Sequence, residues 1–304
     1  MSPGPAERTP VSATRSEPKT VTFRGADDLA LVADEWNKPA DARSSGRDFD
    51  PARPSVLMLH GGGQNRFSWK KTGQILAARG LHVVALDSRG HGDSDRSPEA
   101  TYTVEALCAD TLKVLDQIGR PTVLIGASMG GLTGILTASK AGPDVVSQLI
   151  LVDVVPRYEK DGSARIRDFM FSHVHGFESL EQAADAVAAY LPHRAKPRSP
   201  EGLKKNLRHR DGRWYWHWDP AFLTKPTEDP FVRVEMLEQA AEELTIPILL
   251  IRGKLSDVVS EEAVQDFLAK VPNAEFAELS GAGHTAAGDD NDAFSEVVSE
   301  FVLR

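Results

Sequence analysis

The chain has 304 residues, of which 41% are hydrophobic and 26% are charged, and this suits one large core with or without an inserted lid. Its formal net charge of −9 argues against a nucleic-acid partner, because nucleic-acid-binding proteins concentrate positive charge over a whole domain. Cys108 is the single cysteine, so neither an intrachain disulfide nor a cysteine-rich zinc site can form. A reducing cytoplasm fits this composition.

The N-terminal residues carry no apolar leader, and no stretch of the chain approaches the ~20 apolar residues that span a bilayer. We therefore expect a cytoplasmic protein without a membrane partner. Residues 1–18 are rich in Pro, Ser, Thr and charge, and we expect a disordered tail there. The first strands are predicted at Thr20–Arg24 and Leu29–Trp36, followed by a polar loop around residues 39–54.

The segment that follows alternates apolar strands with helices. Short apolar runs bounded by polar residues or Gly fit central strands that are buried on both faces. These runs are Ser55–His60, His82–Asp87, Pro121–Gly126, Gln148–Asp153 and Ile246–Arg252. Helical patterns lie at Phe67–Arg79, Val104–Ile118, Met129–Lys140 and Glu261–Val271. This alternation predicts right-handed crossovers and an α/β fold with a mostly parallel central sheet flanked by helices.

The alternation is interrupted by about ninety residues between the runs that end at Asp153 and begin at Ile246. This stretch carries helical and aromatic segments but no convincing buried strand. An insertion of this size after a strand is typical of a lid. We therefore predict a core domain formed by residues 19–154 and 246–304, and a helical cap formed by residues 155–245.

The sequence GASMG at residues 126–130 follows an apolar strand directly and opens a helix. In that context the pattern predicts a nucleophile elbow, with Ser128 exposed on a strained turn. Glycines at the flanking positions avoid collisions of side chains with the neighbouring backbone. The N-terminus of the helix favours negative charge near the serine, and the Met129 amide can donate to an oxyanion.

A serine hydroxyl needs a base for its proton and a carboxylate that orients the base. In hydrolases with a nucleophile elbow of this kind, the chain order is Ser, then Asp or Glu, then His. Asp257 follows the strand Ile246–Arg252, and His284 follows a predicted strand at Ala274–Leu279, so we predict them as acid and base. Asp153 also ends a strand and is the alternative acid.

His60 and the glycines Gly61–Gly63 follow the strand that begins at Ser55. A glycine run lets backbone N–H groups turn towards a reacting carbonyl, and Gly62 with Met129 would form an oxyanion hole. No phosphate-binding glycine motif accompanies this run, so a nucleotide function is disfavoured. We expect His60 to hold the loop by hydrogen bonds.

These motifs together resemble the α/β-hydrolase superfamily over residues 20–304, in particular its esterase, perhydrolase and carbon–carbon bond hydrolase branches. The matching segments are HGGGQNRFSW at 60–69, DSRGHGDSD at 87–95, GASMGG at 126–131, GKLSD at 253–257 and GAGH at 281–284. The resemblance implies the triad Ser128, Asp257 and His284. Branches with an Asp nucleophile are disfavoured, and residues 285–288 lack the bulky side chain that many relatives place after the histidine.

Several residues are candidates for contact with a substrate. They are Gly63, Gln64, Trp69, Trp214, Trp216 and Trp218. Tryptophans in the cap favour an apolar or ring-bearing acyl group, or they simply pack the cap on the core. The segment 194–213 holds eight Lys or Arg, which either steer a carboxylate-bearing substrate or form a solvated face, the commoner case.

The sequence thus predicts a serine hydrolase that cleaves a carboxylic ester or lactone through an acyl-enzyme, without a metal or organic cofactor. Its expected partner is a small apolar or aromatic ester or lactone, and a homo-oligomer is left open. A carbon–carbon bond hydrolase or a cofactor-free perhydrolase with the same triad is the first alternative. A non-catalytic relative that binds a small ligand is the second.

Overall fold

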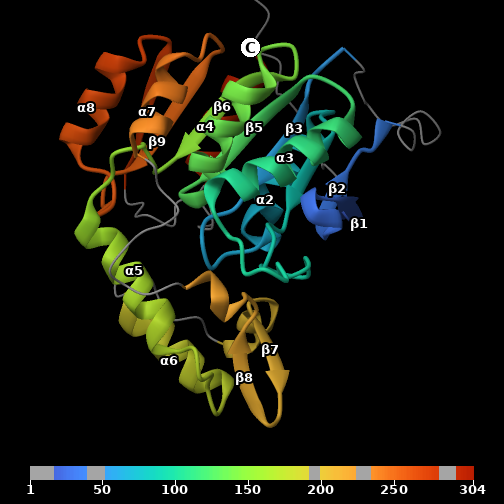
Figure 1. Cartoon of the computed structure of the whole chain (residues 1–304), viewed down its shortest axis with the longest axis vertical. Coiled ribbons are helices and arrows are strands. Elements are labelled where there is room, and N and C mark those ends of the chain that lie inside the picture. The colour runs from blue at the N-terminus through green and yellow to red at the C-terminus, as the bar shows by residue number, and fades with distance from the viewer. Residues whose placement is uncertain (1–16, 40–51, 192–198, 224–233, 281–291) are drawn as a thin grey trace, which may run out of the picture.

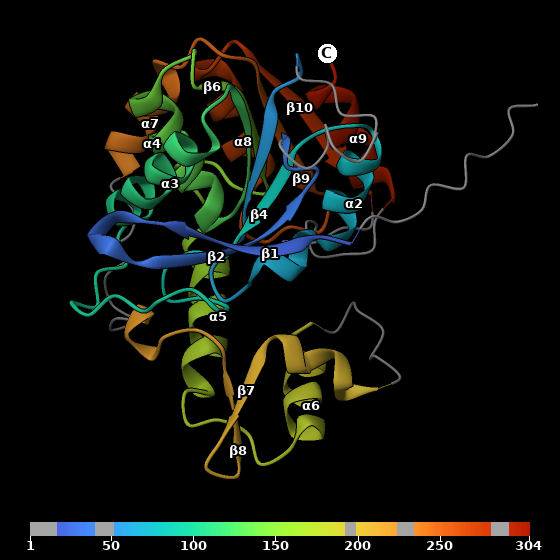
Figure 2. The ribbon, with the colours of Figure 1, turned by 90° about the vertical axis from the view of Figure 1, so that its right-hand side faces the viewer.

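An eight-stranded, mostly parallel sheet forms the centre of the protein, in the order β1-β2-β4-β3-β5-β6-β9-β10 (Figures 1 and 2). The computed structural model describes residues 17–39, 52–191, 199–223, 234–280 and 292–304. The strands are β1 (Lys19–Arg24), β2 (Ala30–Trp36), β3 (Ser55–Leu59), β4 (Val83–Leu86), β5 (Thr122–Ala127), β6 (Val146–Val152), β9 (Ile248–Gly253) and β10 (Ala274–Leu279). All eight coincide with the predicted strands to within a few residues, and the predicted α/β fold with a mostly parallel central sheet is confirmed.

The first two strands run against the rest of the sheet. β1 pairs with β2 and β2 with β4 in antiparallel fashion, whereas all the other neighbours are parallel. Because β3, β5, β6 and β9 point the same way, the residues that follow them meet at one edge. Ligands of open α/β sheets bind at this edge.

The central strands are buried on both faces. In β3, Val56 and Met58 enter one core cluster, whereas Leu57 and Leu59 enter the other, and all four side chains are at most 2% exposed. This division follows from the two-residue period of a strand. It explains why the sequence shows continuous apolar runs instead of polar–apolar alternation.

Helices cover the two faces of the sheet (Figures 1 and 2). The first cluster includes side chains of α3 (Val104–Ile118), α4 (Met129–Ala141), α7 (Val234–Glu242) and α8 (Glu261–Lys270). The second includes side chains of α2 (Lys70–Ala78) and α9 (Asp292–Val302). None of the described helices is both long and apolar enough to cross a bilayer.

The described part of the insertion between β6 and β9 that precedes α7 forms a separate layer beyond one edge of the sheet (Figures 1 and 2), whereas α7 itself packs on the core. This layer contains α5 (Lys160–Ser172), α6 (Leu180–Tyr190) and the short helices η3 (Pro200–Lys205) and η4 (Pro220–Phe222). It also contains an antiparallel hairpin of β7 (Leu207–Arg210) and β8 (Arg213–Trp216). The sequence did not reveal this hairpin, because its strands are short and partly exposed and lack an apolar run.

Hydrogen bonds join the insertion to the loops that follow β3 and β4. The Asp219 N–H donates to the Gly90 carbonyl at 2.8 Å, and the Tyr102 hydroxyl donates to the Asp219 carboxylate at 2.5 Å. The Asn65 amide donates to the Lys205 carbonyl at 3.0 Å. The insertion is therefore seated on the edge of the sheet that carries the predicted elbow.

Candidate active site

Ser128 occupies a strained turn between β5 and α4. Its backbone has φ 48° and ψ −117°, a conformation that costs a non-glycine residue on the order of 1–3 kcal/mol. Its own N–H donates to the Val152 carbonyl at 3.1 Å, which ties the turn to the end of β6. The residue is partly exposed and lies at the carboxyl edge of the sheet, where β5 ends.

The glycines around Ser128 are required by close backbone contacts. A Cβ atom built on Gly126 would lie 2.3 Å from the Gly130 carbonyl oxygen, and one built on Gly130 would lie 2.3 Å from the Leu59 carbonyl oxygen. A Cβ atom on Gly131 would lie 2.4 Å from a methyl group of Val154. Carbon atoms cannot approach so closely, so α4 packs against the end of β3 only because these side chains are absent.

The glycine loop after β3 lies beside the serine. A Cβ atom built on Gly61 would lie 3.4 Å from Ser128 Cβ, an ordinary contact distance. The Gly61 N–H donates to the Gln64 side-chain oxygen at 3.1 Å, and the Gln64 N–H donates back to the Gly61 carbonyl at 3.0 Å. Gln64 therefore closes the loop on itself.

The amides of this loop are divided between bonded and free groups. The N–H groups of Gly61 and Gln64 are used within the loop, and that of Gly63 donates to His91 Nε2 at 3.2 Å. Within the described part of the chain, the Gly62 and Met129 N–H groups donate to no protein acceptor. Two unengaged amides from these positions are what an oxyanion hole requires.

His60 holds the glycine loop, as expected from the sequence. Its Nε2 accepts a hydrogen bond from the Ser88 N–H at 3.0 Å, so the ring proton lies on Nδ1 and is donated to the Gly61 carbonyl at 2.8 Å. The ring is fully buried. Burial lowers the pKa of His60 to about 4, against a smaller effect of the Gly61 carbonyl.

The two candidate acids differ in their surroundings. Asp153 follows β6 with φ 51° and is 0% exposed. Its carboxylate accepts hydrogen bonds from the Ser256 hydroxyl at 2.6 Å and from the Gly253 N–H at 3.1 Å. Asp257 lies on the loop after β9, its side chain is 46% exposed, and it forms an ion pair with Arg165 of α5. His284, the predicted base, lies outside the described residues.

Three side chains of the insertion lie against the glycine loop. A Cβ atom built on Gly63 would lie 2.9 Å from Met170 Cε and 3.5 Å from the Trp218 ring, and one on Gly62 would lie 3.4 Å from the Phe222 ring. Trp218 was predicted as a pocket residue. Met170 and Phe222 were not, because nothing in the linear sequence brings α5 to Gly63 or η4 to Gly62.

The remaining predicted pocket residues have structural contacts. Trp69, in the short helix η2 (Arg66–Trp69), is 0% exposed and packs on Phe294 in the second core cluster. Trp216 stacks on Trp218 with 4.8 Å between ring centroids, and Trp214 packs on His209. These rings support the core and the hairpin.

The described part of the basic segment is engaged with the protein itself. Arg208 donates to the Gly92 carbonyl and to the Asp93 carboxylate, and Arg213 donates to the carbonyls of His175 and Gly176. Such contacts fit a solvated face tied to its neighbours. Residues 194–198 lie outside the described residues.

A second Ser–His–carboxylate arrangement lies at the opposite edge of the sheet. The Ser55 hydroxyl bonds to His82 Nδ1 at 2.8 Å, and His82 Nε2 bonds to the Glu35 carboxylate at 2.9 Å. Ser55 is 0% exposed and begins β3, whereas Ser128 follows the end of the parallel strand β5. A serine without access to solvent cannot reach a substrate, so this arrangement is structural.

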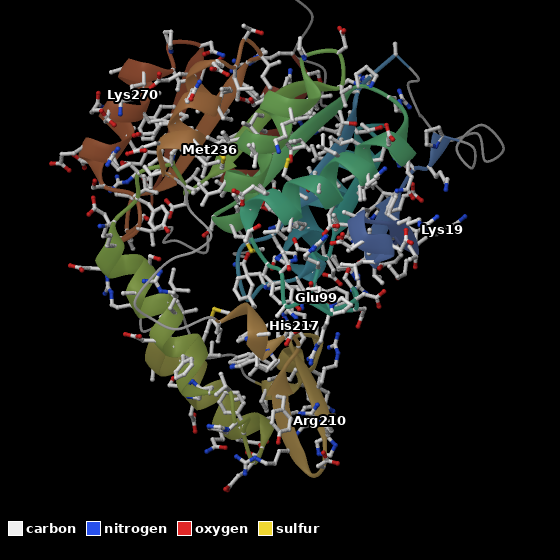
Figure 3. The ribbon with its side chains drawn as sticks, in the orientation of Figure 1. Lys19, Glu99, Arg210, His217, Met236 and Lys270 are labelled. Carbon is white, nitrogen blue, oxygen red and sulfur yellow. The ribbon has the colours of Figure 1, made fainter. Side chains whose placement is uncertain are left out.

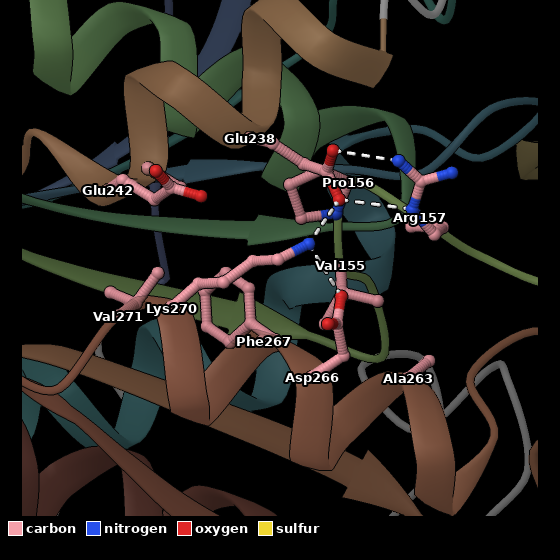
Figure 4. Close-up of a pocket in the computed structure, with 11 residues that line it drawn as sticks. Val155, Pro156, Arg157, Glu238, Glu242, Ala263, Asp266, Phe267, Lys270 and Val271 are labelled. Carbon is pink, nitrogen blue, oxygen red and sulfur yellow. Dashed lines mark hydrogen bonds and ion pairs between the residues drawn. The ribbon is translucent and has the colours of Figure 1, made fainter.

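A pocket between α7, α8 and the segment after β6 is a further hollow of the surface (Figure 4). Its charged side chains pair with one another. Lys270 contacts Glu238 at 3.0 Å and Asp266 at 2.8 Å, and Arg157 contacts Glu238 at 2.9 Å. No residue predicted for catalysis lines this pocket. Among the described residues, no cluster of three or more His, Cys, Asp or Glu is arranged to hold a metal ion.

The sequence pattern of the alpha/beta hydrolase family matches residues 56–297. The chain is 30% identical over 295 residues to Esterase Rv0045c of Mycobacterium tuberculosis, and this match covers 90% of this chain and 95% of that protein. It is 27% identical over 271 residues to the sn-1-specific diacylglycerol lipase ABHD11 of Mus musculus, covering 84% and 83% respectively. The chain therefore belongs to the alpha/beta hydrolase family.

A solved structure agrees with this assignment. The crystal structure of an alpha/beta hydrolase from Novosphingobium aromaticivorans superposes with a TM-score of 0.78 at 25% identity, over 95% of this chain and 99% of that one. The structure of the Mycobacterium tuberculosis esterase superposes with a TM-score of 0.72 at 25% identity, over 95% of this chain and 93% of that one.

Acid should destabilise the protein through its buried histidines. Unfolded imidazoles bind a proton near pH 6.5, whereas folded His60 does so only at about pH 4 and folded His91 at about pH 3, chiefly because both are buried. The free energy of unfolding should fall, as the pH drops from 6.5 towards each folded pKa, by about 1.4 kcal/mol per pH unit and ring. Urea unfolding at about pH 7.5, 6 and 5 measures this slope.

The variant His60→Asn isolates one ring, since its amide can keep the bond to the Gly61 carbonyl without titrating. Its slope should be shallower than that of the wild type by about 1.4 kcal/mol per pH unit. Identical slopes in variant and wild type would contradict the prediction that His60 is neutral in the folded protein and takes up a proton on unfolding.

Ser55→Ala should reduce stability by about 1–2 kcal/mol, because His82 Nδ1 loses its buried partner. The reactivity of the elbow should stay unchanged. Urea unfolding measures the first effect, and the yield of fluorophosphonate adduct in intact-protein mass spectra measures the second. Loss of the adduct in folded Ser55→Ala would show that the second arrangement takes part in the chemistry.

Proposed function

We propose that this protein is a serine hydrolase that cleaves a carboxylic ester or lactone through an acyl-enzyme, with Ser128 as nucleophile. The observation that carries the proposal is the strained Ser128 turn together with two unengaged amides, that of the adjacent Met129 and that of Gly62 in the neighbouring glycine loop. The names of the relatives, an esterase and a lipase, support ester bonds as the substrate class.

The residues act in sequence during turnover. Ser128 Oγ attacks the carbonyl carbon as His284 accepts the hydroxyl proton, and the Gly62 and Met129 N–H groups stabilise the oxyanion. The N-terminus of α4 adds a favourable dipole at the same point. His284 then returns the proton to the leaving alcohol, and a water molecule activated by the same ring releases the acid.

We further propose Asp153 as the carboxylate that orients His284. A carboxylate in this role is buried and hydrogen-bonded, because it must fix one ring tautomer and stabilise the imidazolium that forms. The full burial of Asp153 and its bonds to Ser256 and Gly253 support this role. The exposure of Asp257 and its ion pair with Arg165 fit the sequence-based preference less well.

The apolar side chains beside the glycine loop support an apolar acyl group. Phe222, Met170 and Trp218 come from three parts of the insertion and meet Gly62 and Gly63. Rings and a thioether next to an oxyanion hole favour burial of hydrocarbon and disfavour charged acyl chains. We therefore propose that the insertion acts as a cap that selects apolar esters.

A fluorophosphonate should form a single covalent adduct on the wild type and none on Ser128→Ala, because only an activated serine reacts. Turnover of p-nitrophenyl butyrate should fall by about 10⁴-fold or more in the same variant. Intact-protein mass and ester hydrolysis measure the two effects. A folded wild type without adduct, or an adduct retained in Ser128→Ala, would contradict the proposal.

Asp153→Asn should lower kcat by about 10²- to 10⁴-fold, because an amide stabilises the wrong tautomer of the base. Asp257→Asn serves as the matched variant and should change kcat by less than about 10-fold, as expected for an exposed charge pair. Steady-state kinetics with thermal melts of both proteins make the comparison. The reverse order of effects would assign the acid to Asp257.

A further inference from the structure

Three buried histidines, whose rings are tilted against one another, form a continuous row from the glycine loop to the insertion. The ring centroids of His60 and His91 are 5.1 Å apart, and those of His91 and His217 are 6.0 Å apart. The three residues are at most 4% exposed. They come from three distant segments: the end of β3, the loop after β4 and the segment that leaves β8. Figure 3 shows His217 where the hairpin meets the core.

Each of the three rings is a neutral imidazole, because one of its nitrogens accepts a hydrogen bond from a backbone N–H. His91 Nε2 accepts from the Gly63 N–H at 3.2 Å, so its proton lies on Nδ1, which faces the Arg89 carbonyl at 3.1 Å. His217 Nδ1 accepts from the Gly92 N–H at 2.7 Å, so its proton lies on Nε2. A doubly protonated ring could not accept either bond.

The Nε2–H group of His217 is buried. No well-formed hydrogen bond joins this group to a partner among the described residues. The Gly63 carbonyl raises the pKa of His217, against the larger effect of burial, so this carbonyl lies next to the ring.

The three rings address three successive peptide groups of the glycine loop. His60 bonds the carbonyl of the Gly61–Gly62 peptide, His91 bonds the N–H of the Gly62–Gly63 peptide, and His217 faces the carbonyl of the Gly63–Gln64 peptide. A peptide group is planar, so fixing its carbonyl also fixes the direction of its N–H. His60 therefore sets the direction of the Gly62 N–H, and the next two rings hold the following planes.

We propose that His60, His91 and His217 are positioning residues for the oxyanion hole, and that His217 makes the insertion part of the catalytic machinery. This inference rests on the function proposed above, since it assigns the orientation of the Gly62 N–H to the three histidines. The hole reaches its working geometry only when the insertion is seated and all three rings are neutral.

Burial keeps the three rings neutral, and the charged groups around them act in both directions. His91 faces the carboxylates of Asp87 and Asp219, and His217 faces the guanidinium of Arg208. Burial outweighs the two carboxylates and lowers the pKa of His91. The same burial, with the neighbouring rings and Arg208, lowers the pKa of His217.

His217→Leu should lower kcat for p-nitrophenyl butyrate by about 10- to 100-fold with a change in KM below about 3-fold, because a misdirected N–H weakens the transition state more than the substrate complex. His217→Gln should recover much of the loss, since its side-chain N–H₂ can reach the Gly63 carbonyl. His209→Leu is the matched control, because His209 is an exposed ring of the same hairpin.

Amide hydrogen exchange reports the loop without any turnover. The Gly63 and Gly92 amides should exchange at least about 10-fold faster in His217→Leu than in the wild type and His209→Leu. If His217→Leu does not fold, His217→Asn keeps an acceptor for the Gly92 N–H but not the contact with Gly63, and it should show the loss of kcat in a folded protein.

Unchanged kcat and unchanged exchange in a folded His217 variant would overturn the inference, as would faster exchange with unchanged kcat in an active enzyme. Absence of both ester turnover and a Ser128 adduct in the wild type would instead overturn the proposed function. In that case the comparison of amide exchange alone decides whether His217 holds the glycine loop. Unchanged exchange in a folded His217 variant would then show that His217 does not hold it.

Discussion

The close packing of α4 against the end of β3 is the constraint on which the rest of the site depends. Gly126, Gly130 and Gly131 let the helix approach to a distance that any side chain would prevent. This approach brings the Ser128 turn next to Gly61, so nucleophile and glycine loop become neighbours. The strain at Ser128, on the order of 1–3 kcal/mol, is held by the sheet and helix on either side.

Buried charges hold the loop after β4 in a similar way. Arg66 pairs with Asp34 and Asp87, and Arg89 bonds Asp110 at 2.6 and 2.8 Å. These ion pairs are out of water and hydrogen-bonded, so removing one partner would leave an uncompensated charge. They fix the segment that carries His91, and this ring in turn holds the Gly63 amide. The DSRGHGDSD segment is thus a support for the glycine loop.

The insertion contacts the DSRGHGDSD segment and the glycine loop directly. Asp219 bonds Gly90 and Tyr102, His217 bonds Gly92, and Phe222 lies on Gly62. These contacts place the apolar wall and the third histidine of the row in one short segment. Substrate selection and the geometry of the oxyanion hole are therefore coupled through the same residues in the mechanism that we propose.

The sequence determined what depends on local pattern. Apolar runs predicted the strands because burial on both faces leaves no polar positions, and the GASMG segment after such a run predicted the elbow because only glycines fit there. The hairpin β7–β8 escaped, since short half-exposed strands carry no comparable pattern. Its tryptophans Trp214 and Trp216 looked like pocket residues, but they pack on neighbouring rings, whereas Trp218, which follows the hairpin, lies against the glycine loop.

Only the tertiary structure decided which side chains meet. Asp153 and Asp257 both follow strands, and their difference lies in burial and partners, which no linear pattern encodes. The second Ser–His–Glu arrangement and the row of His60, His91 and His217 join residues that are up to about 157 positions apart. Such contacts form when separate segments are brought together by burial of the core, so the sequence names the residues while the packed fold selects their partners.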